Sequence, residues 1–592
     1  MKIVRVYLGD RSSETFEFDD QIEAGLWGGR LLGIGLIARN SSVREPLDPE
    51  SPLVISVGSL AGTGFPLGNR LTMVFRSPQT GTIAWTQTGG YAAYELASLG
   101  ISALYITGKC ENLSTLVISD KGISFVDAEP FRGVGAVQTC AVLRIAAGDA
   151  RILTIGPSGE KHQPIATVIN DMGRSSGVRH GAGAVLGSKN IKAIIIKTSK
   201  RGAKRPKNSL GFVELLRRLK KKIEESHLLN IEKGLLAVHG TAIAAETLAE
   251  NDALPLKNYS TTCLDGYERI GGRTLSKTVL VARLTCSMCP VSCRRETIGF
   301  GVRSEGPDYA QISSLGTNCY VLDHEKISYL TSLCYDAGVD PIEMGNTLAV
   351  YMDMSEHGYT EEHLAWGDFE KMANLIEMTA RAEGLGKLLS RGARDMAKAL
   401  GDDYFAPAVK NISIQNTDPR AEKAWGLVNA VETFGGGVHI WVYPTIVHSF
   451  ERIEIQTIFR EKPTSDTIAE KVYQKQVEVA SLDSLGVCAF SRLVFDVKDY
   501  VDGLCAFYGL KVEELTFDHV GRSCITLERY LNKLYGFDES DDRLPKKFTE
   551  TPLPSGKHRG ETCDVEEFLR PYRKFVNSNY ASNILSIFPK LT

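Results

Sequence analysis

Residues 191–223 read IKAIIIKTSKRGAKRPKNSLGFVELLRRLKKKI, and the chain changes character within this stretch. It begins with a short apolar run, Ile191 to Ile196, that is typical of a buried strand. The segment TSKRGAKRPKNS that follows is basic and contains proline, which indicates a solvated linker rather than a binding element. Beyond the linker, apolar residues recur at helical spacing among lysines and arginines: Phe212, Leu215, Leu216, Leu219 and Ile223. We therefore expect a domain boundary near residue 210.

The part of the chain before this boundary, residues 1–208, is predicted to be a β-rich domain. It is rich in Gly, Val, Ile and Thr, and turn residues separate its short strand-like runs. Besides the run at 191–196, these are Val54 to Val57, Leu71 to Phe75, Ala103 to Ile106 and Thr115 to Ile118. The rest of the chain is predicted to be mainly helical, with further helical patterns at 327–333, 369–400 and 467–480. This order of elements indicates an α+β fold.

The composition is that of a globular protein, with 592 residues of which 43% are hydrophobic and 23% charged. Its 68 basic and 71 acidic side chains give a net charge of −3, so we expect no nucleic-acid partner. The N-terminal residues do not resemble a signal peptide, and no apolar run approaches the ~20 residues of a membrane helix. We therefore expect a cytoplasmic location without a membrane span. Twelve cysteines in that compartment indicate metal ligands or core thiols rather than disulfides.

Three of these cysteines lie together in CSMCPVSC at residues 286–293. Cys286, Cys289 and Cys293 have the spacing C-x2-C-x3-C, which lets three thiolates converge on one metal centre. Three local thiolates and one remote thiolate suit a four-iron cubane, with Cys488 in DSLGVC as the predicted remote ligand. Zinc, or simple buried thiols, are the alternatives that the spacing leaves open.

Glycine-rich segments supply candidate anion sites. Residues 173–193 read GRSSGVRHGAGAVLGSKNIKA, in which small residues beside arginines let backbone N–H groups approach a phosphate. The segment matches neither a P-loop nor a dinucleotide fingerprint, so it does not predict a nucleotide. A second cluster of Gly, Thr and Arg spans residues 58–81 and 86–90. Plain turns in a β-rich domain are the alternative for each cluster taken alone.

The chain resembles the tungsten-containing aldehyde:ferredoxin oxidoreductases, and the resemblance covers nearly its whole length. Eight strings carry it in family order: GLWGGRLLGIGLI at 25–37, the glycine block at 58–90, GVRHGAGAVLGSKNIKAI at 177–194, HGTAIA with NDALPLKNY at 239–259, CSMCPVSC, EGPDYAQISSLGTNC at 305–319, CYDAGVD at 334–340 and DSLGVC at 483–488. The resemblance implies a β-rich base domain, residues 1–208, followed by two mainly helical domains, residues 209–415 and 416–592.

The resemblance also implies the cofactors and the residues that hold them. In this family a tungsten or molybdenum ion is held by two pyranopterins, magnesium bridges their phosphates, and a [4Fe-4S] cluster lies beside one pterin. The match implies that Cys286, Cys289, Cys293 and Cys488 bind the cluster. The residues implied to contact pterin or phosphate are Arg70, Gly89, Gly90, Arg179, Gly181, Ala182, Gly183, Asp336, Asp340, Asp483, Gly486 and Val487.

The chain departs from the family pattern at the residues expected to transfer protons. Where the family has E-Y-E-T, this sequence has Asp308, Tyr309, Ala310 and Gln311, so the second carboxylate is absent. A base that accepts a proton near neutral pH is needed for aldehyde oxidation, and we expect either Asp308 or a histidine to replace the missing carboxylate. The candidate histidines are His439 in TFGGGVHIWV and, less favoured, His448.

Three functions remain open from the sequence. The first is oxidation of an aldehyde to a carboxylate, with electrons passing through the cluster to ferredoxin or to an iron–sulfur subunit. The second, favoured by the loss of the carboxylate at Ala310, is a low-potential reductase subunit acting on an aromatic acyl-coenzyme A thioester, with Cys319 as a candidate metal-ligating thiolate. The third is a non-catalytic zinc or iron–sulfur scaffold. We expect a small-molecule substrate and a homo-oligomer or hetero-complex.

Overall fold

The computed structural model describes residues 1–18, 25–171, 179–199, 205–415, 417–436, 464–576 and 584–591. Its first part contains the strands β1 (Lys2–Tyr7), β2 (Ser12–Glu17), β3 (Leu53–Val57), β4 (Leu71–Arg76), β5 (Ile83–Thr88), β6 (Ala103–Thr107), β7 (Ser114–Ser119), β8 (Gly122–Asp127), β9 (Arg151–Ile155), β10 (Val168–Asn170) and β11 (Ile191–Lys197). The five runs predicted from the sequence correspond to β3, β4, β6, β7 and β11. The β-rich first part is confirmed.

These strands form two sheets. A six-stranded sheet has the order β2-β1-β6-β3-β4-β5, and only its β1–β6 pair is parallel. A five-stranded sheet has the order β10-β9-β11-β7-β8, with β11 parallel to β7. The helices of this part are α1 (Gly29–Asn40), α2 (Ala92–Ser98), α3 (Ala136–Ala147), α4 (Pro157–Glu160) and α5 (Ala182–Ser188). Helix α1 packs on β3 and β4, where Leu31, Ile34 and Ile37 are buried.

The remainder of the chain is mainly helical, as the sequence predicts. Its helices are α6 (Ser209–Glu225), α7 (Leu235–His239), α8 (Ile243–Glu250), α9 (Gly272–Thr278), α10 (Tyr309–Gln311), α11 (His324–Ala337), α12 (Pro341–Glu356), α13 (Phe369–Arg381), α14 (Gly384–Leu389), α15 (Ala393–Ala399), α16 (Lys423–Val431), α18 (Ser465–Leu485), α19 (Val497–Tyr508), α20 (Glu514–Leu534), α21 (Lys546–Glu550) and α22 (Glu566–Phe575). Helix α6 buries Phe212, Leu215, Leu219 and Ile223, the predicted apolar face. Among the described residues, no helix is long and apolar enough to cross a membrane.

The pattern at 369–400 forms three helices rather than one. Helix α13 ends at Ala382, which has φ of 55°, and Gly392 with φ of 85° precedes α15. The left-handed Ala382 ends α13, and Gly392 is the residue before the first turn of α15; the apolar spacing alone did not reveal either break. Helix α12 is buried along its whole length except at Glu356, which makes it the central helix of this part.

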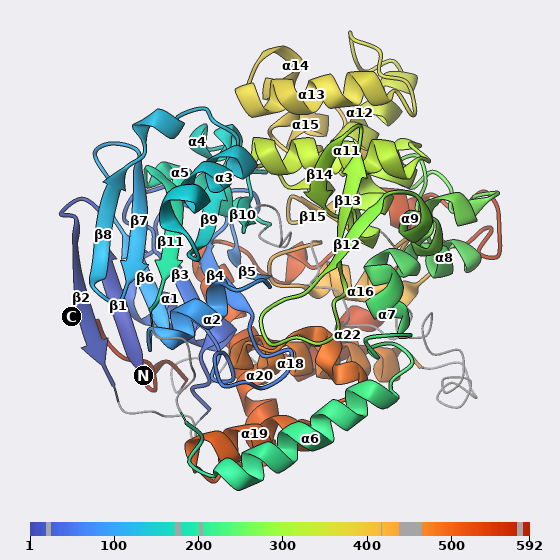
Figure 1. Ribbon diagram of the computed structural model, residues 1–592. Helices are drawn as coiled ribbons and strands as arrows, with labels where there is room; N and C mark the ends of the chain where they lie inside the picture. The colour runs from blue at the N-terminus through green and yellow to red at the C-terminus, as the bar shows by residue number, and fades with distance from the viewer. Residues whose placement is uncertain are drawn as a thin grey trace.

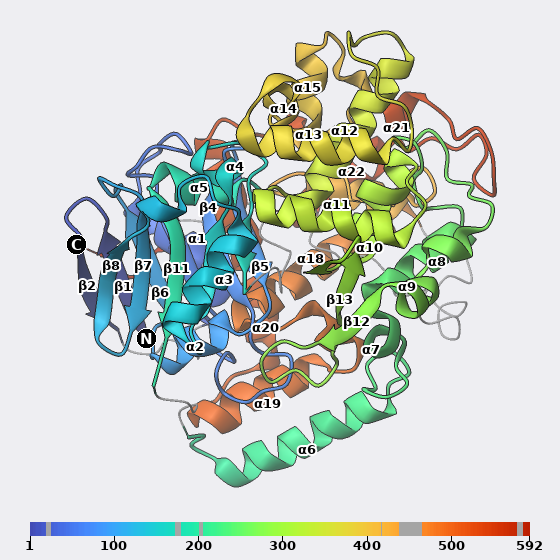
Figure 2. The ribbon, with the colours of Figure 1, turned by 45° about the horizontal axis from the view of Figure 1, so that its top comes forward.

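A small three-stranded sheet packs against α11. It consists of β12 (Leu280–Leu284), β13 (Arg294–Gly299) and β14 (Val302–Glu305), all antiparallel, and a two-stranded ribbon pairs β15 (Ala408–Val409) with β16 (Ile412–Ser413). In Figures 1 and 2, strands β1 to β11 gather on one side and helices α11 to α15 on the other, and the β12–β13 hairpin lies below α11 on the helical side. The loop at the tip of this hairpin is the cysteine motif.

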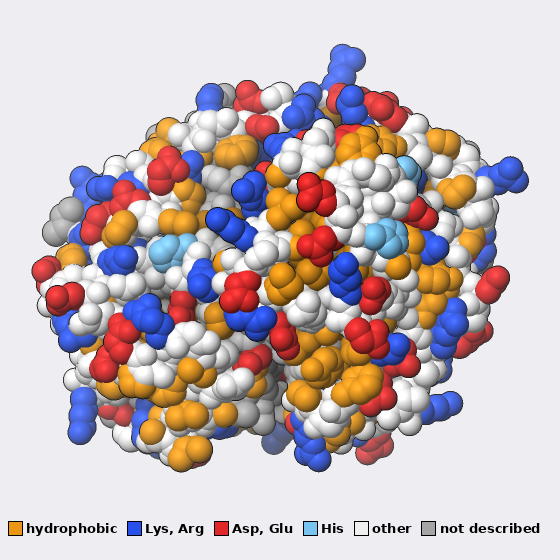
Figure 3. All heavy atoms as spheres, turned by 90° about the horizontal axis from the view of Figure 1, so that it is seen from above, with side chains coloured by type: hydrophobic (Ala, Val, Ile, Leu, Met, Phe, Trp, Pro, Cys, Tyr) orange, Lys and Arg blue, Asp and Glu red, His pale blue; other side chains and the backbone are white. Residues whose placement is uncertain are grey.

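The surface seen from above carries charges of both signs. Figure 3 shows acidic and basic side chains interspersed on this face, with hydrophobic side chains in small patches between them. No broad basic patch covers this face, in agreement with the net charge of −3.

Candidate active site

Four cysteines meet at one cavity between the β-rich part and the helical part. Cys286, Cys289 and Cys293 lie in the connection between β12 and β13, and Cys488 follows the end of α18. All four line the cavity, which has a volume of about 210 Å³.

Hydrogen bonds hold the cysteine loop against the β-rich part. The Ser287 N–H donates to the Gly90 carbonyl at 2.9 Å, and Asn69 Nδ2 donates to the Ser287 carbonyl at 3.1 Å. Gly89 gives the Cys286 thiol room to lie against the β-rich part, because a Cβ at residue 89 would lie 2.6 Å from Cys286 Sγ. On the opposite side, the Cys488 N–H donates to the Leu67 carbonyl at 2.8 Å. The first part of the chain therefore positions cysteines from two distant segments.

The four thiols influence one another electrostatically. Burial, followed by the neighbouring thiols, raises the pKa of Cys293 to about 12. The same two causes raise the pKa of Cys289, and burial raises that of Cys488. Four neighbouring thiolates therefore need bound cations to exist together, which is what a metal cluster supplies.

The arrangement does not fit a single metal ion. Within the described ranges, no group of three or more His, Cys, Asp or Glu side chains is arranged to hold one ion. A zinc site needs its sulfurs about 2.3 Å from one point, whereas a cubane distributes its four ligands over four iron corners. Four cysteines around one open cavity fit a cubane better than zinc.

Several predicted cofactor residues also line this cavity. They are Arg70, Gly89, Arg179 and Asp340, together with Asp308 and Ala310 from the start of α10. Arg179 Nε donates to Asp340 Oδ2 at 2.6 Å, and Nη2 lies 3.4 Å from Glu343 Oε2. The predicted anion-binding arginine is thus already balanced by carboxylates, and Asp340 Oδ1 caps α12 by accepting from the Ile342 N–H.

Other predicted residues lie outside the cavity lining. The Gly183 N–H donates to the Ala166 carbonyl, and a Cβ at Gly181 would lie 2.7 Å from the Pro164 carbonyl oxygen, so α5 uses its small residues for close packing. Gly90, Ala182, Gly486 and Val487 also do not line the cavity. Gly486 has φ of 73° and ends α18, which turns the chain toward Cys488. A cofactor role for these residues stays a prediction.

The structure does not bring Asp336 or Cys319 to the cavity. Asp336 accepts hydrogen bonds from the backbone of Val137 and Gln138 at the start of α3. The Cys319 thiol is fully buried and donates to the carbonyls of Ser314 at 3.3 Å and Gly345 at 3.2 Å. Burial raises its pKa, and the thiol does not line the cavity, so a metal-ligating role for Cys319 stays a prediction.

Asp308 is placed to exchange protons with the cavity. It caps α10, where its Oδ1 accepts from the Ala310 N–H at 3.1 Å, and its own N–H donates to Gln311 Oε1. Burial raises the pKa of Asp308 to about 6, against the opposing effect of those backbone hydrogen bonds. A carboxyl group with this pKa can accept a proton near neutral pH. The predicted candidates His439 and His448 lie outside the described residues.

The cavity also contains residues that the sequence analysis missed. Tyr309 is buried, and its hydroxyl has no hydrogen-bond partner in the described part of the chain, so it is an available donor at the cavity. The ring centroids of His180 and Phe434 lie 4.5 Å apart, and those of Trp85 and Phe434 lie 5.3 Å apart. All three aromatic residues line the cavity. The quoted motifs contain Tyr309 and His180, but their spacing gave no reason to choose them.

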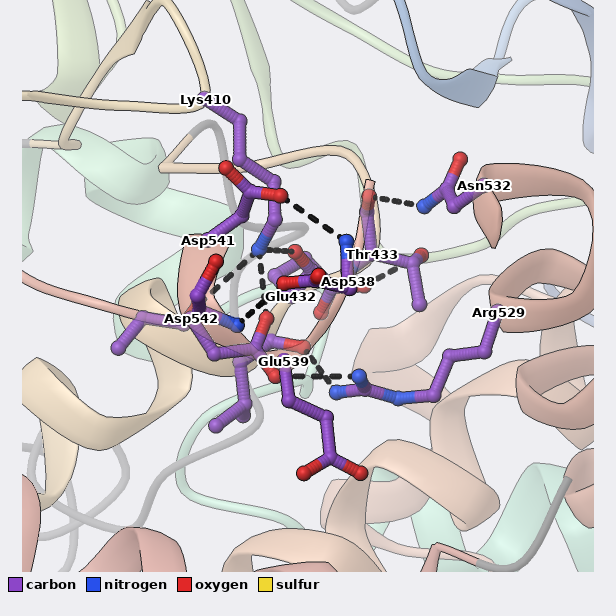
Figure 4. Close-up of polar contacts among 12 residues, drawn as sticks. Lys410, Glu432, Thr433, Arg529, Asn532, Asp538, Glu539, Asp541 and Asp542 are labelled. Atoms are coloured by element: carbon purple, nitrogen blue, oxygen red, sulfur yellow. Dashed lines mark hydrogen bonds and ion pairs between the residues drawn. The ribbon is translucent and has the colours of Figure 1, made fainter. Parts of the chain in front are cut away.

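A buried ion-pair network fixes the turn that carries Phe434. Lys410 Nζ donates to the carbonyls of Ala430 and Glu432 and to Asp542 Oδ1 at 2.8 Å, as Figure 4 shows. Arg529 Nη1 donates to Asp542 Oδ2 at 3.0 Å, and its Nη2 donates to the Val431 carbonyl. The two cations therefore cap the last carbonyls of α16, and Asp542 balances their charge.

The residues present fit a pterin cofactor and a cubane. Four cysteines line the cavity, and the buried Tyr309 hydroxyl is a donor with no hydrogen-bond partner among the described residues. A buried donor of this kind is costly in a protein interior unless a ligand satisfies it. Asp483 is 1% exposed and binds Arg30 through Oδ2 at 3.2 Å, but it does not line the cavity, so its predicted pterin contact stays a prediction.

Two family descriptions match almost the whole chain. "Aldehyde ferredoxin oxidoreductase, N-terminal domain" matches residues 3–198, and "Aldehyde ferredoxin oxidoreductase, domains 2 & 3" matches residues 214–579. The chain is 31% identical to the tungsten-containing aldehyde ferredoxin oxidoreductase of Pyrococcus furiosus, over 97% of this chain and 95% of that protein. It is 24% identical to the aliphatic sulfonate oxidoreductase WOR-like subunit of the same organism, over 97% and 93%.

A solved structure shares the fold. The active-site complex BamBC of benzoyl coenzyme A reductase, bound to 1,5-dienoyl-CoA, superposes with a TM-score of 0.81 at 21% identity. The match covers 98% of this chain and 94% of that one.

Proposed function

Because the chain belongs to the aldehyde ferredoxin oxidoreductase family, and is therefore a tungsten, pterin and iron–sulfur oxidoreductase, we propose that it oxidises an aldehyde to a carboxylate. The observation that carries the proposal is the cavity itself, where the four cysteines meet Arg70, Arg179 and Asp308. Identity of 31% to an aldehyde-oxidising relative over nearly the whole chain supports the aldehyde as substrate.

In this proposal the cysteines and the arginines of the cavity bind different cofactors. Cys286, Cys289, Cys293 and Cys488 would hold the [4Fe-4S] cluster, and Arg70 and Arg179, which line the same cavity, would contact the charged groups of a pterin cofactor. When bound, the tungsten–pterin centre supplies the two-electron redox chemistry, and the cluster passes the electrons to ferredoxin or to an iron–sulfur subunit. Magnesium between the pterin phosphates is part of the same proposal.

Asp308 is the proposed proton acceptor. Oxidation of an aldehyde by water yields a carboxylic acid, two electrons and two protons, so a base must accept protons at the cavity. With alanine at position 310, Asp308 is the carboxyl group of α10 that lines the cavity, and its pKa of about 6 suits this task. Tyr309 would donate a hydrogen bond to the substrate oxygen from the adjacent position.

A second candidate function is reduction of an aromatic acyl-coenzyme A thioester at low potential. The observation that favours it is Ala310, which removes the carboxylate that aldehyde-oxidising members use. The aromatic residues Trp85, Phe434 and Tyr309 at the cavity are compatible with a flat ring.

One assay separates the two functions. Anaerobically purified protein with its metals bound is offered short aliphatic aldehydes, aromatic aldehydes and benzoyl-coenzyme A, with viologen dyes as electron acceptor or donor. We expect aldehyde-dependent dye reduction. Turnover of the thioester without any aldehyde oxidation would refute the first function in favour of the second.

A further inference from the structure

Arg294 is a charged residue of the cavity wall that none of the predicted site roles uses. It directly follows Cys293, so its Cα lies about 3.8 Å from the Cα of a proposed cluster ligand. Strand β13 begins at Arg294, whose side chain is 12% exposed and lines the cavity. This arginine therefore brings a positive charge to the place where the four cysteines meet.

Glu305 holds the Arg294 guanidinium in place. It is the last residue of β14, which runs antiparallel to β13, and it also lines the cavity. Arg294 Nε donates to Glu305 Oε1, and Arg294 Nη2 forms an ion pair with Glu305 Oε2. Such a two-pronged contact fixes the plane of a guanidinium as well as its position. The Gly306 N–H donates to the Arg295 carbonyl at 2.9 Å, which ties the two strands together beside this pair.

The third nitrogen of this guanidinium has no partner in the described part of the chain. Arg294 Nη1 is buried, and no described residue accepts a hydrogen bond from it. A buried N–H group of this kind is costly unless a ligand satisfies it. The sulfur atoms of an iron–sulfur cluster accept hydrogen bonds, and such bonds are among the features that set the potential of the cluster.

The charge of Arg294 acts on the cysteine loop and on the proposed proton acceptor. Burial lowers the pKa of Arg294, but the neighbouring negative groups, above all Glu305, outweigh burial and raise the pKa, so the guanidinium stays protonated. Burial raises the pKa of Cys293 and of Asp308, and the charge of Arg294 opposes this effect at both groups. Negative charge at the cysteine loop is therefore stabilised by Arg294.

We propose that the Arg294 guanidinium, held by Glu305, raises the reduction potential of the [4Fe-4S] cluster. Reduction adds one electron, supplied by substrate oxidation, to a site that four thiolates already make negative, so a fixed positive charge favours the reduced form. A unit charge ~10 Å away, at an effective dielectric constant of about 20, shifts such an equilibrium by at least about tenfold. The inference rests on the cluster part of the proposed function and does not depend on which substrate is oxidised.

The test measures the cluster potential in anaerobically purified protein with its metals bound, by a redox titration followed by electron paramagnetic resonance. Arg294→Gln should shift the equilibrium about tenfold toward the oxidised cluster, which lowers the potential by about 59 mV for one electron. Arg294→Lys should retain most of the parent potential, because lysine keeps the charge. The matched control is Arg283→Gln: Arg283 is exposed on β12 of the same sheet, so solvent and salt screen its charge and the potential should not change.

Glu305→Gln separates the effect of charge from damage to the loop. This variant removes the counter-charge of Arg294, so the potential should rise, opposite to the change in Arg294→Gln. Damage to the cysteine loop would instead lower iron per chain in both variants. An unchanged potential in Arg294→Gln, an equal loss in Arg294→Lys, or a fall in both Arg294→Gln and Glu305→Gln would overturn the proposal.

The remaining outcomes are also decisive. If Arg294→Gln does not keep its cluster, Glu305→Gln carries the test, and a potential at or below that of the parent protein refutes the role of Arg294. A parent protein without iron would contradict the cluster itself and this inference with it. A parent protein that holds the cluster but oxidises no aldehyde would contradict the proposed substrate alone.

Discussion

Replacement of Gly89 by alanine should cost the protein its iron–sulfur cluster while leaving its fold in place. A Cβ at residue 89 would lie 2.6 Å from Cys286 Sγ and 3.2 Å from an Arg70 guanidinium nitrogen. Because ordinary contacts between such atoms are ~3.5–4.0 Å, the sulfur has to move by about 1 Å. Metal–ligand distances tolerate only about 0.2 Å, so a displacement of this size removes Cys286 from the ligand set.

The effect on stability should be much smaller than the effect on iron. Insertion of one methyl group into a packed site costs about 1–3 kcal/mol, because Cys286 can rotate away. Iron per chain and the electron paramagnetic resonance of the reduced cluster are measured alongside the unfolding midpoint. Gly9→Ala is the control, since a Cβ there meets only a carbonyl oxygen at 3.8 Å. Gly89→Ala protein with four irons and an unchanged cluster spectrum would refute the placement of Cys286 as a ligand.

Three further changes test other parts of the site. Cys488→Ser should lose cluster iron, measured per chain, because it removes the ligand supplied by the helical part; normal iron and normal reduction would show that Cys488 is not a ligand. Turnover should rise with pH around a midpoint near 6, because Asp308 is protonated below its pKa and can act as a base only above it. Asp308→Asn should abolish that rise, and an unchanged pH profile in this variant would exclude Asp308 as the base. Asp542→Asn leaves Lys410 and Arg529 buried without their counter-charge, so we expect about 3–5 kcal/mol of destabilisation in chemical denaturation; a loss below 1 kcal/mol would contradict the charge-balancing role.

The sequence predicted local structure well where apolar periodicity decides it. The run Leu71 to Phe75 became β4, and the apolar stripe that includes Phe212 and Leu219 became the buried face of α6. Periodicity could not reveal that Ala382 and Gly392 would take left-handed conformations and divide the pattern at 369–400. Such stops depend on local backbone conformation rather than on the apolar spacing.

The candidate site was predicted in part. Cysteine spacing and the family resemblance selected Cys286 and Cys488, which the fold brings to one cavity although 202 positions separate them in the sequence. Cys319 was a candidate because it is a cysteine in a family motif, but its thiol donates to backbone carbonyls inside the core. The buried contacts of Arg30 with Asp483 and Glu528 could not be predicted, because 453 and 498 positions separate these residues in the sequence.

The most direct test of the account is the metal content of protein purified without exposure to air. Tungsten, molybdenum, iron and zinc are counted per chain by elemental analysis. The account predicts one tungsten and about four irons, since the four cysteines around the cavity hold a cubane beside a tungsten–pterin centre. Zinc in the absence of tungsten, molybdenum and iron would contradict it.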